Sequence, residues 1–323
     1  MDDDAQINRA LVHVLQAQTA PPFKHRVGCA LGQAIKAMLV DAPTAHDRRT
    51  DQLAADGYVR LGQVLSADQC AAVRQSLEQR PCFATHVVVP SNRASFTPST
   101  LGECAKTSHL ACYELAEVIE APGLWETANR PDILSLAETY LGCCPTLYSL
   151  NAWWSFPRDR TAKYTQHFHR DFDDFKFCTL FVYLTDVDEN SGPHRFIRKS
   201  HQFEFLPGIV QAAEQRLGRS LQGLRGDQFF GVEQGPECDR LYTDVFGDLI
   251  DTIVGPAGFA FLADTSALHM GVPPISSRRL MFWARYGLYT NPMALSPVAA
   301  PARIAPRLTD SRTAHINRCI VRV

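Results

Sequence analysis

Three residues, His169, Asp171 and His269, constrain the fold more than any other feature of this sequence. His169 and Asp171 are separated by one residue. The alternation that begins at Gln166 is typical of a β-strand, in which residues two apart point to the same face. The spacing therefore predicts that an imidazole and a carboxylate project side by side. His269 follows Asp171 by 98 residues (269 − 171), so it would come from a strand that returns beside the first after a long excursion.

The chemistry of these three side chains indicates a metal site. Imidazole and carboxylate suit Fe(II), Mn(II) or Zn(II) better than a soft ion that prefers thiolates, and two histidines with one carboxylate form the facial triad of non-haem Fe(II) oxygenases. A barrel of two packed sheets, of the jelly-roll or cupin type, brings such distant strands together. We therefore expect a mainly β fold with flanking helices (α+β) and a double-stranded β-helix core. Within it, His169, Asp171 and His269 would be the catalytic metal ligands.

An arginine lies ten residues after His269 (279 − 269), at the start of an apolar, strand-like run. A guanidinium binds a carboxylate through two parallel hydrogen bonds, which a lysine cannot do as well. Arg279 is therefore a candidate for binding a carboxylate. Arg278 remains the rival, because neighbouring strand residues point to opposite faces and only one of the two can point into the barrel.

Four segments of the chain resemble the phytanoyl-CoA dioxygenase family of Fe(II)- and 2-oxoglutarate-dependent oxygenases, over roughly residues 54–290. They are an opening strand and helix at 56–69, the triplet His169-Arg170-Asp171, the run from Asp186 to His201, and the segment from Ala257 to Arg279. Two residues depart from the family pattern. Ser191 is inserted into the usual Asn-Gly pair, and Lys199 replaces the usual Gly before Ser-His.

The resemblance implies Fe(II) as the metal, 2-oxoglutarate as the co-substrate and O2 as the oxidant. It implies that 2-oxoglutarate binds the metal through its keto-acid end, pairs its far carboxylate with Arg279, and is converted to succinate and CO2. Hydroxylation of a small molecule is the expected reaction, with desaturation or cyclisation as variants. Two other functions stay open. A non-catalytic binding protein on the same barrel would have lost a ligand, and a Zn(II) hydrolase would need a general base near the metal and leaves Arg279 unexplained.

The composition limits the partners of this chain. A hydrophobic content of 46% and a charged content of 20% are typical of a soluble globular protein, and a net charge of −2 gives no electrostatic reason to bind nucleic acid. No apolar run approaches the ~20 residues that cross a bilayer. The acidic start Met1–Asp4 is unlike a signal peptide. We therefore expect a cytoplasmic protein, as a monomer or homodimer, with no nucleic-acid or membrane partner. A basic run from Arg158 to Lys176 favours an anionic substrate.

Ten cysteines are scattered along the chain without a Cys-x-x-Cys pair, which predicts reduced thiols and no zinc ribbon. The adjacent Cys143 and Cys144 have no assigned role.

One domain is expected over residues 1–323. It comprises an N-terminal helical extension (1–50) and an oxygenase core (54–290) with a long insertion at about 203–251. Helices are predicted at 4–20, 27–40, 67–79, 132–141 and near 209–217. Strands are predicted at 58–64, 84–89, 146–156, 177–184, 250–254, 258–262 and 279–286. Residues 90–110 are predicted to form a long loop, of a kind that is often functional.

Overall fold

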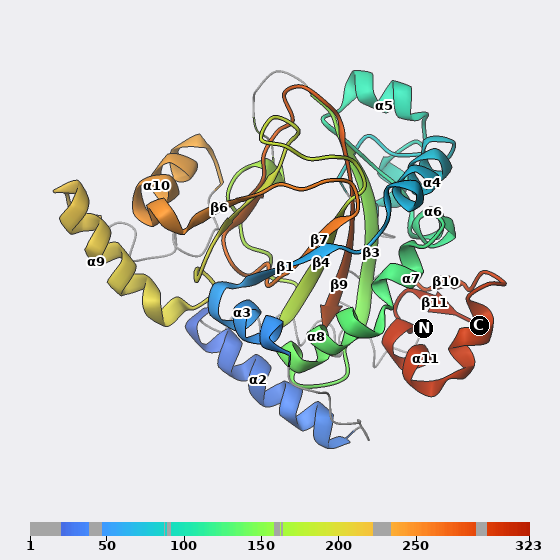
Figure 1. Cartoon of the computed structure of the whole chain (residues 1–323), viewed down its shortest axis with the longest axis horizontal. Coiled ribbons are helices and arrows are strands. Elements are labelled where there is room, and N and C mark those ends of the chain that lie inside the picture. The colour runs from blue at the N-terminus through green and yellow to red at the C-terminus, as the bar shows by residue number, and fades with distance from the viewer. Residues whose placement is uncertain are drawn as a thin grey trace.

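Two antiparallel sheets form the centre of the molecule (Figure 1). The computed structural model describes residues 21–38, 47–86, 88, 92–157, 162, 164–221, 234–288 and 296–323. The larger sheet has the strand order β1-β7-β4-β9-β3-β2 and the smaller sheet the order β6-β5-β8. Neighbouring strands in both sheets come from distant parts of the chain, so the predicted double-stranded β-helix is confirmed.

The strands are β1 (Tyr58–Gln63), β2 (Leu110–Cys112), β3 (Thr146–Ser155), β4 (Phe177–Tyr183), β5 (His194–Ile197), β6 (Ile250–Ile253), β7 (Phe259–Ala263), β8 (His269–Gly271) and β9 (Arg279–Gly287). A small parallel pair, β10 (Val298–Ala299) and β11 (Val321–Arg322), lies near the C-terminus.

The helices are α2 (Pro21–Met38), α3 (Arg48–Asp56), α4 (Ala67–Glu78), α5 (Leu101–Thr107), α6 (Leu115–Glu120), α7 (Leu124–Ala128), α8 (Pro131–Leu141), α9 (Leu206–Leu217), α10 (Pro236–Phe246) and α11 (Ser311–Asn317). None of the described helices is both long and apolar enough to cross a membrane.

Strand β4 shows how the sequence builds the layers. All seven of its residues are buried, as its nearly continuous apolar run predicts. Leu180 and Val182 belong to the main core together with residues of α8, whereas Phe181 and Tyr183 belong to a second cluster with Trp283 of β9. Alternate residues of one strand therefore pack against the helical layer and against the barrel interior, where the candidate site lies.

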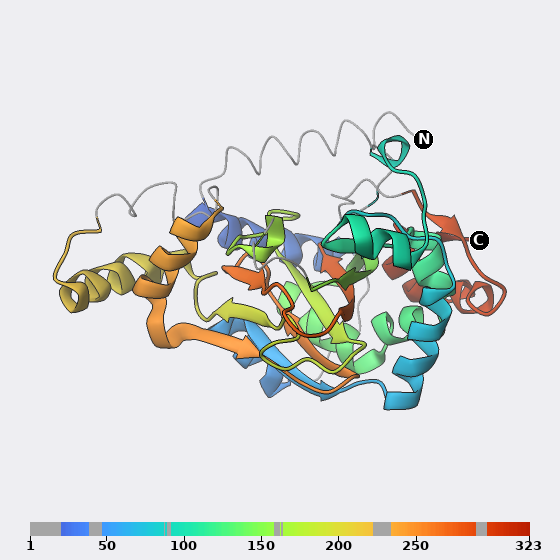
Figure 2. The same cartoon turned by 90° about the horizontal axis from the view of Figure 1, so that it is seen from above.

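The segment predicted to be a long insertion, about 203–251, contains α9 and α10, which pack on each other at one end of the molecule (Figures 1 and 2). Their apolar cluster includes Phe168 and Leu268, each of which is adjacent in sequence to a predicted metal ligand. Phe168 also makes an edge contact with Tyr242 of α10, with 6.1 Å between ring centroids. Helices α9 and α10 thus pack against the two segments that carry His169 and His269.

Most predicted elements are present in the described residues. Ser66 and Gln69 form a capping box at the start of α4, in the helix predicted at 67–79. Two predictions outside the metal site were wrong. Residues 84–86 form bends rather than a strand, and the predicted loop at 90–110 contains α5, whose first turn is capped by the Thr100 hydroxyl. The predicted helix at 4–20 lies outside the described residues.

Candidate metal centre and active-site pocket

His169, Asp171 and His269 converge at one point inside the barrel. Each offers one ligand atom, and these atoms lie within 4.8 Å of one another. The distance is 3.9 Å from His169 Nε2 to Asp171 Oδ1 and 3.8 Å from His269 Nε2 to Asp171 Oδ2. Both histidines are buried, and their ring centroids are 4.3 Å apart. The structure therefore brings together the three ligands predicted from the sequence.

The backbone near the metal ligands differs from the predicted strand. Residues 164–166 form a 3-10 turn, and His169 makes an isolated antiparallel bridge with His269. His169 and His269 exchange backbone hydrogen bonds of 2.9 and 3.0 Å, and the Asp171 N–H donates to the Thr265 carbonyl at 2.8 Å. These hydrogen bonds hold residues 169–171 beside β8, so both side chains still reach the same point without a regular strand.

Each histidine is oriented by a backbone carbonyl. The His169 Nδ1 atom lies 2.8 Å from the His167 carbonyl oxygen, and the His269 Nδ1 atom lies 2.9 Å from the Ala267 carbonyl oxygen. A carbonyl accepts only, so Nδ1 carries the proton and Nε2 is left with a lone pair directed at the centre of the cluster. Metal-binding histidines are commonly held in this way.

The charge states of the three side chains suit a metal ion. Burial lowers the pKa of His269 to about 3, and His169 adds to this effect, so its imidazole is neutral at pH 7. Burial alone would raise the pKa of Asp171, but that pKa is about 2, and the positive charge of the Arg285 guanidinium is the strongest influence that lowers it. The cluster thus offers two imidazoles and one carboxylate, a donor set suited to a borderline divalent ion.

Behind Asp171 lies an ion-pair network that sequence reasoning missed. Arg285 of β9 donates from Nη2 to Asp171 Oδ2 at 2.8 Å and from Nη1 to Asp173. The Tyr148 hydroxyl donates to Asp173 at 3.0 Å. Although burial opposes it, the two carboxylates hold the pKa of Arg285 above its usual range. Arg285 therefore fixes the orientation of the Asp171 carboxylate.

Arg279 and Arg278 point to opposite faces of β9. Arg279 is 3% exposed, donates to the Ser155 hydroxyl at 3.0 Å and to the Gly192 carbonyl, and lines the same pocket as the three metal ligands. Burial lowers its pKa only to about 10, so it stays charged at pH 7. The guanidinium nitrogen of Arg279 and the candidate ligands thus share one enclosed space.

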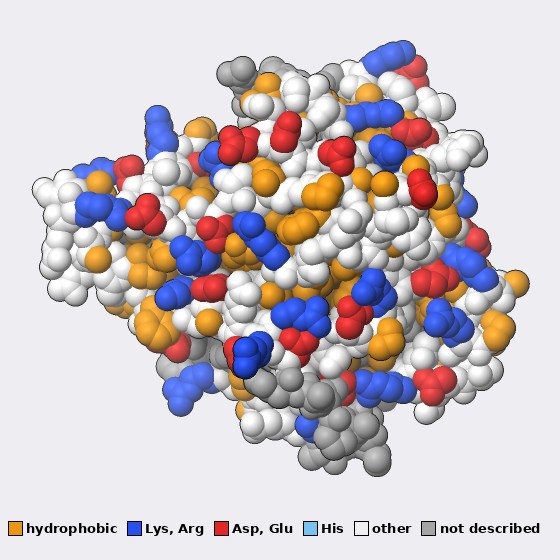
Figure 3. Space-filling view, in the orientation of Figure 1, with side chains coloured by type: hydrophobic (Ala, Val, Ile, Leu, Met, Phe, Trp, Pro, Cys, Tyr) orange, Lys and Arg blue, Asp and Glu red, His pale blue; other side chains and the backbone are white. Residues whose placement is uncertain are grey.

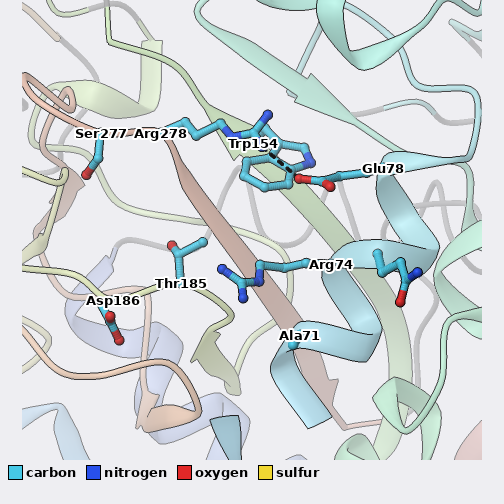
Figure 4. Close-up of a pocket in the computed structure, with 9 residues that line it drawn as sticks. Ala71, Arg74, Glu78, Trp154, Thr185, Asp186, Ser277 and Arg278 are labelled. Atoms are coloured by element: carbon cyan, nitrogen blue, oxygen red, sulfur yellow. Dashed lines mark hydrogen bonds and ion pairs between the residues drawn. The ribbon is translucent and has the colours of Figure 1, made fainter. Parts of the chain in front are cut away.

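Arg278 lies on the outside of the barrel. It pairs with Glu78 at 2.8 Å and covers the ring of Trp154 (Figure 4). A cavity of about 510 Å³ surrounds these side chains and also includes Arg74 and Asp186. This cavity contains none of the three candidate ligands, so Arg278 is separated from the metal centre.

Other residues considered from the sequence have structural contacts. His167 Nδ1 lies 2.7 Å from Asp239 of α10, and His167 does not line the metal pocket. The Ser200 hydroxyl donates to the Ile197 carbonyl at 2.7 Å, and His201 Nε2 lies 2.9 Å from the Ala54 carbonyl oxygen. Ser200 and His201 therefore hold a turn. Lys199 adopts a left-handed conformation with φ 65°, where the family usually has Gly.

His194, to which the sequence assigns no role, lines the metal pocket. Burial lowers its pKa well below the usual range, and Arg279 contributes to this shift, so the ring is neutral. Its ring contacts Phe181 and Phe261, with centroid distances of 4.8 and 5.4 Å. No local sequence signal distinguishes this histidine from one in an exposed loop.

Residues 53–216, just over half of the 323-residue chain, match the family model of phytanoyl-CoA dioxygenase (PhyH). The chain belongs to the phytanoyl-CoA dioxygenase family. The match includes His169 and Asp171, and the structure places His269 and Arg279 beside them. The predicted class, non-haem iron and 2-oxoglutarate-dependent enzymes, is confirmed at the level of the family.

Solved structures similar to this chain have low sequence identity to it. The "non-heme alpha ketoglutarate dependent epimerase SnoN from nogalamycin biosynthesis" is 17% identical, covers 77% of this chain and 86% of its own, and has a TM-score of 0.47. EctD from S. alaskensis, with 2-oxoglutarate and 5-hydroxyectoine, is 16% identical, covers 78% of this chain and 79% of its own, and has a TM-score of 0.48. HygX from Streptomyces hygroscopicus, with nickel and 2-oxoglutarate, is 12% identical, covers 79% of this chain and 91% of its own, and has a TM-score of 0.46. No curated protein matches the chain.

Proposed function

We propose that this protein is an Fe(II)- and 2-oxoglutarate-dependent dioxygenase that hydroxylates a small molecule, with desaturation or cyclisation as variants. One observation carries the proposal. Two imidazole Nε2 atoms and one carboxylate meet in the pocket that also contains the buried guanidinium of Arg279. A facial triad leaves coordination positions open for co-substrate and O2, and an arginine suits the far carboxylate of 2-oxoglutarate.

His169, Asp171 and His269 would hold the iron. Their Nδ1 contacts and the Arg285 ion pair fix the ligand atoms before metal binds, which lowers the entropic cost of assembling the site. When bound, Fe(II) together with 2-oxoglutarate and O2 supplies the oxidising power and yields succinate and CO2. The chain itself orients the ligands, positions the substrate C–H bond and excludes water from the pocket.

Arg279 would bind the far carboxylate of 2-oxoglutarate. The Ser155 hydroxyl and the Gly192 carbonyl hold its guanidinium in place, while Nε has no hydrogen-bond partner among the described residues. The Gly192 carbonyl lies next to the inserted Ser191, whose hydroxyl donates to Asp188. The departure from the family pattern is therefore absorbed within the loop and leaves the arginine's acceptor in place.

The charge of the substrate would depend on the basic residues near the metal ligands. The sequence prediction of an anionic substrate rests on a basic run, but two of its members make their contacts elsewhere. Arg170 donates to the Ser200 and Ser266 carbonyls, and Lys176 lies over the ring of Tyr140. Neither lines the metal pocket. The anionic character would then depend on residues 158, 160 and 163, which lie outside the described ranges.

A Zn(II) hydrolase with the same ligands is the second candidate. It would need a general base that faces the metal, and the carboxylate next to Asp171, Asp173, is paired with Arg285 and Tyr148. A hydrolase also gives no role to Arg279. Because all three ligand types are present and oriented, the non-catalytic alternative has no support from a missing ligand.

The test is succinate formation by the purified protein with Fe(II), 2-oxoglutarate, ascorbate and O2, across a panel of compounds. Iron-dependent succinate release that disappears in His269→Ala and persists in Arg278→Ala would support the proposal. Release that survives in His269→Ala, or hydrolysis of an ester panel with Zn(II) in place of iron, would contradict it.

A further inference from the structure

Two tryptophans and an arginine form a wall of the metal pocket. Trp153 lies on β3, and Trp283 and Arg285 lie two residues apart on the adjacent strand β9, so all three point into the barrel. The two indoles make an edge contact with 6.0 Å between centroids, and the Arg285 guanidinium lies 4.7 Å from the centroid of Trp283. This wall is largely apolar, and it faces the same space as the metal ligands.

Each residue of this wall carries a buried N–H group without a partner. Trp153 Nε1, Trp283 Nε1 and Arg285 Nε have no hydrogen-bond partner among the described residues. Indole and guanidinium nitrogens only donate, so no rearrangement of their protons can satisfy one with another. A buried donor without an acceptor is costly, and the same pocket also contains Arg279 Nε and His194 Nδ1 without a partner among the described residues. This concentration of unpartnered nitrogens indicates that a ligand supplies the acceptors.

The two other tryptophans lie outside the pocket. Trp154 Nε1 donates to the Tyr113 hydroxyl at 3.0 Å. Trp125 Nε1 has no partner, but Trp125 lies in the main core and does not line the metal pocket. Trp125 and Trp154 therefore serve as internal controls for Trp153 and Trp283.

Among the described residues, the charges around the pocket are balanced once the proposed metal and co-substrate are bound. Arg279, Arg285 and a divalent ion offset Asp171, Asp173 and the two carboxylates of 2-oxoglutarate. A charged substrate would add an uncompensated charge to a buried space, which is strongly unfavourable. Acceptor groups without net charge, such as ketone, amide or ether oxygens, satisfy the donors without that penalty.

We infer that the substrate is an uncharged ring compound whose oxygens accept hydrogen bonds from Trp153, Trp283 and Arg285. The indole surfaces contact its ring, and the three N–H groups orient its oxygens beside the metal. The inference rests on the proposed function, because the charge balance includes 2-oxoglutarate. It names the substrate class that this function leaves open.

Indole NMR signals test the inference on the full chain loaded with diamagnetic Zn(II) and 2-oxoglutarate. Acetophenone is the probe, with ethylbenzene as its partner without an acceptor and benzoate as its anionic partner. Single Trp→Phe variants assign the four indole N–H signals. Any three of these variants suffice, because the remaining signal then belongs to the fourth tryptophan. We expect acetophenone to shift the signals of Trp153 and Trp283 and to leave those of Trp125 and Trp154 in place.

Acetophenone should also bind about tenfold more tightly than ethylbenzene, and more tightly than benzoate while 2-oxoglutarate is present. Equal binding of acetophenone and ethylbenzene, unmoved Trp153 and Trp283 signals, or tighter binding of benzoate would overturn the inference. Titration with 2-oxoglutarate alone comes first. If isothermal titration detects no binding of 2-oxoglutarate, the proposed function fails; if 2-oxoglutarate binds and acetophenone does not, only the present inference fails.

Discussion

Replacing Arg279 by Ala removes a buried guanidinium at the far end of the metal pocket. The side chain is 3% exposed, and its guanidinium donates hydrogen bonds to the Ser155 hydroxyl and the Gly192 carbonyl. Removing one partner of a buried charge pair costs about 3–5 kcal/mol. Since about 1.4 kcal/mol corresponds to tenfold in affinity, the dissociation constant of 2-oxoglutarate should rise by roughly a hundredfold to several thousandfold.

Arg278→Ala is the matched control, because it removes the same group from the adjacent residue. Arg278 is exposed and pairs with Glu78 on the surface. An exposed pair contributes about 1 kcal/mol or less, so 2-oxoglutarate affinity should stay within about fivefold of wild type. Arg279→Lys keeps the charge but loses the paired hydrogen bonds, and we expect an intermediate affinity.

Isothermal titration of the Zn(II)-loaded protein with 2-oxoglutarate measures these affinities. A parallel titration with the metal alone shows whether the triad is intact, and thermal unfolding shows whether each variant folds. Unchanged 2-oxoglutarate affinity in Arg279→Ala, with a large loss in Arg278→Ala, would refute the orientation of β9 on which the argument depends.

The remaining predictions concern Arg285, Lys199 and the cysteines. Arg285→Met leaves Asp171 and Asp173 without their shared cation, so the metal dissociation constant should rise about tenfold to a hundredfold in a Co(II) titration; an unchanged constant would show that Arg285 does not position Asp171. Lys199→Gly should raise the free energy of unfolding by ~0.5–1 kcal/mol in urea, because relief of the left-handed strain exceeds the entropy cost of Gly; a loss of stability would contradict it. Burial raises the pKa of Cys70 to about 11 and of Cys82 to about 12, so native protein at pH 8 should react with a thiol reagent first at the less buried Cys29 and Cys238. The pKa values of Cys70 and Cys82 are higher in the folded than in the unfolded state, so the contribution of these two thiols to stability should fade as the pH rises from about 9 towards 12. Denatured, unreduced protein should show all ten thiols free.

The candidate ligands and Arg279 could be predicted because their signal is local. A His-x-Asp triplet, a distant His and an arginine that opens an apolar strand each identify a chemical role, and alternation along β9 predicts which residues point inward. The same alternation places Arg285 inward, so an arginine in an otherwise apolar run was a usable signal for it.

Other contacts depend on tertiary structure. The partner of Arg285, Asp173, is 112 residues away in sequence, and Asp239 reaches His167 from the insertion across 72 residues. Helix α5 was predicted as loop because its Ser- and Thr-rich approach is typical of turns, whereas Thr100 serves as its N-cap. Neither the pairing of distant charges nor the use of a hydroxyl as a cap follows from composition alone.

The central claim is that His169, Asp171 and His269 bind Fe(II) together with 2-oxoglutarate. Anaerobic addition of Fe(II) and then 2-oxoglutarate should produce a weak visible charge-transfer band in wild-type protein. The band should be absent in His269→Ala and present in Arg278→Ala. A wild-type protein that shows no band and binds Zn(II) tightly, or a band that survives in His269→Ala, would contradict the account.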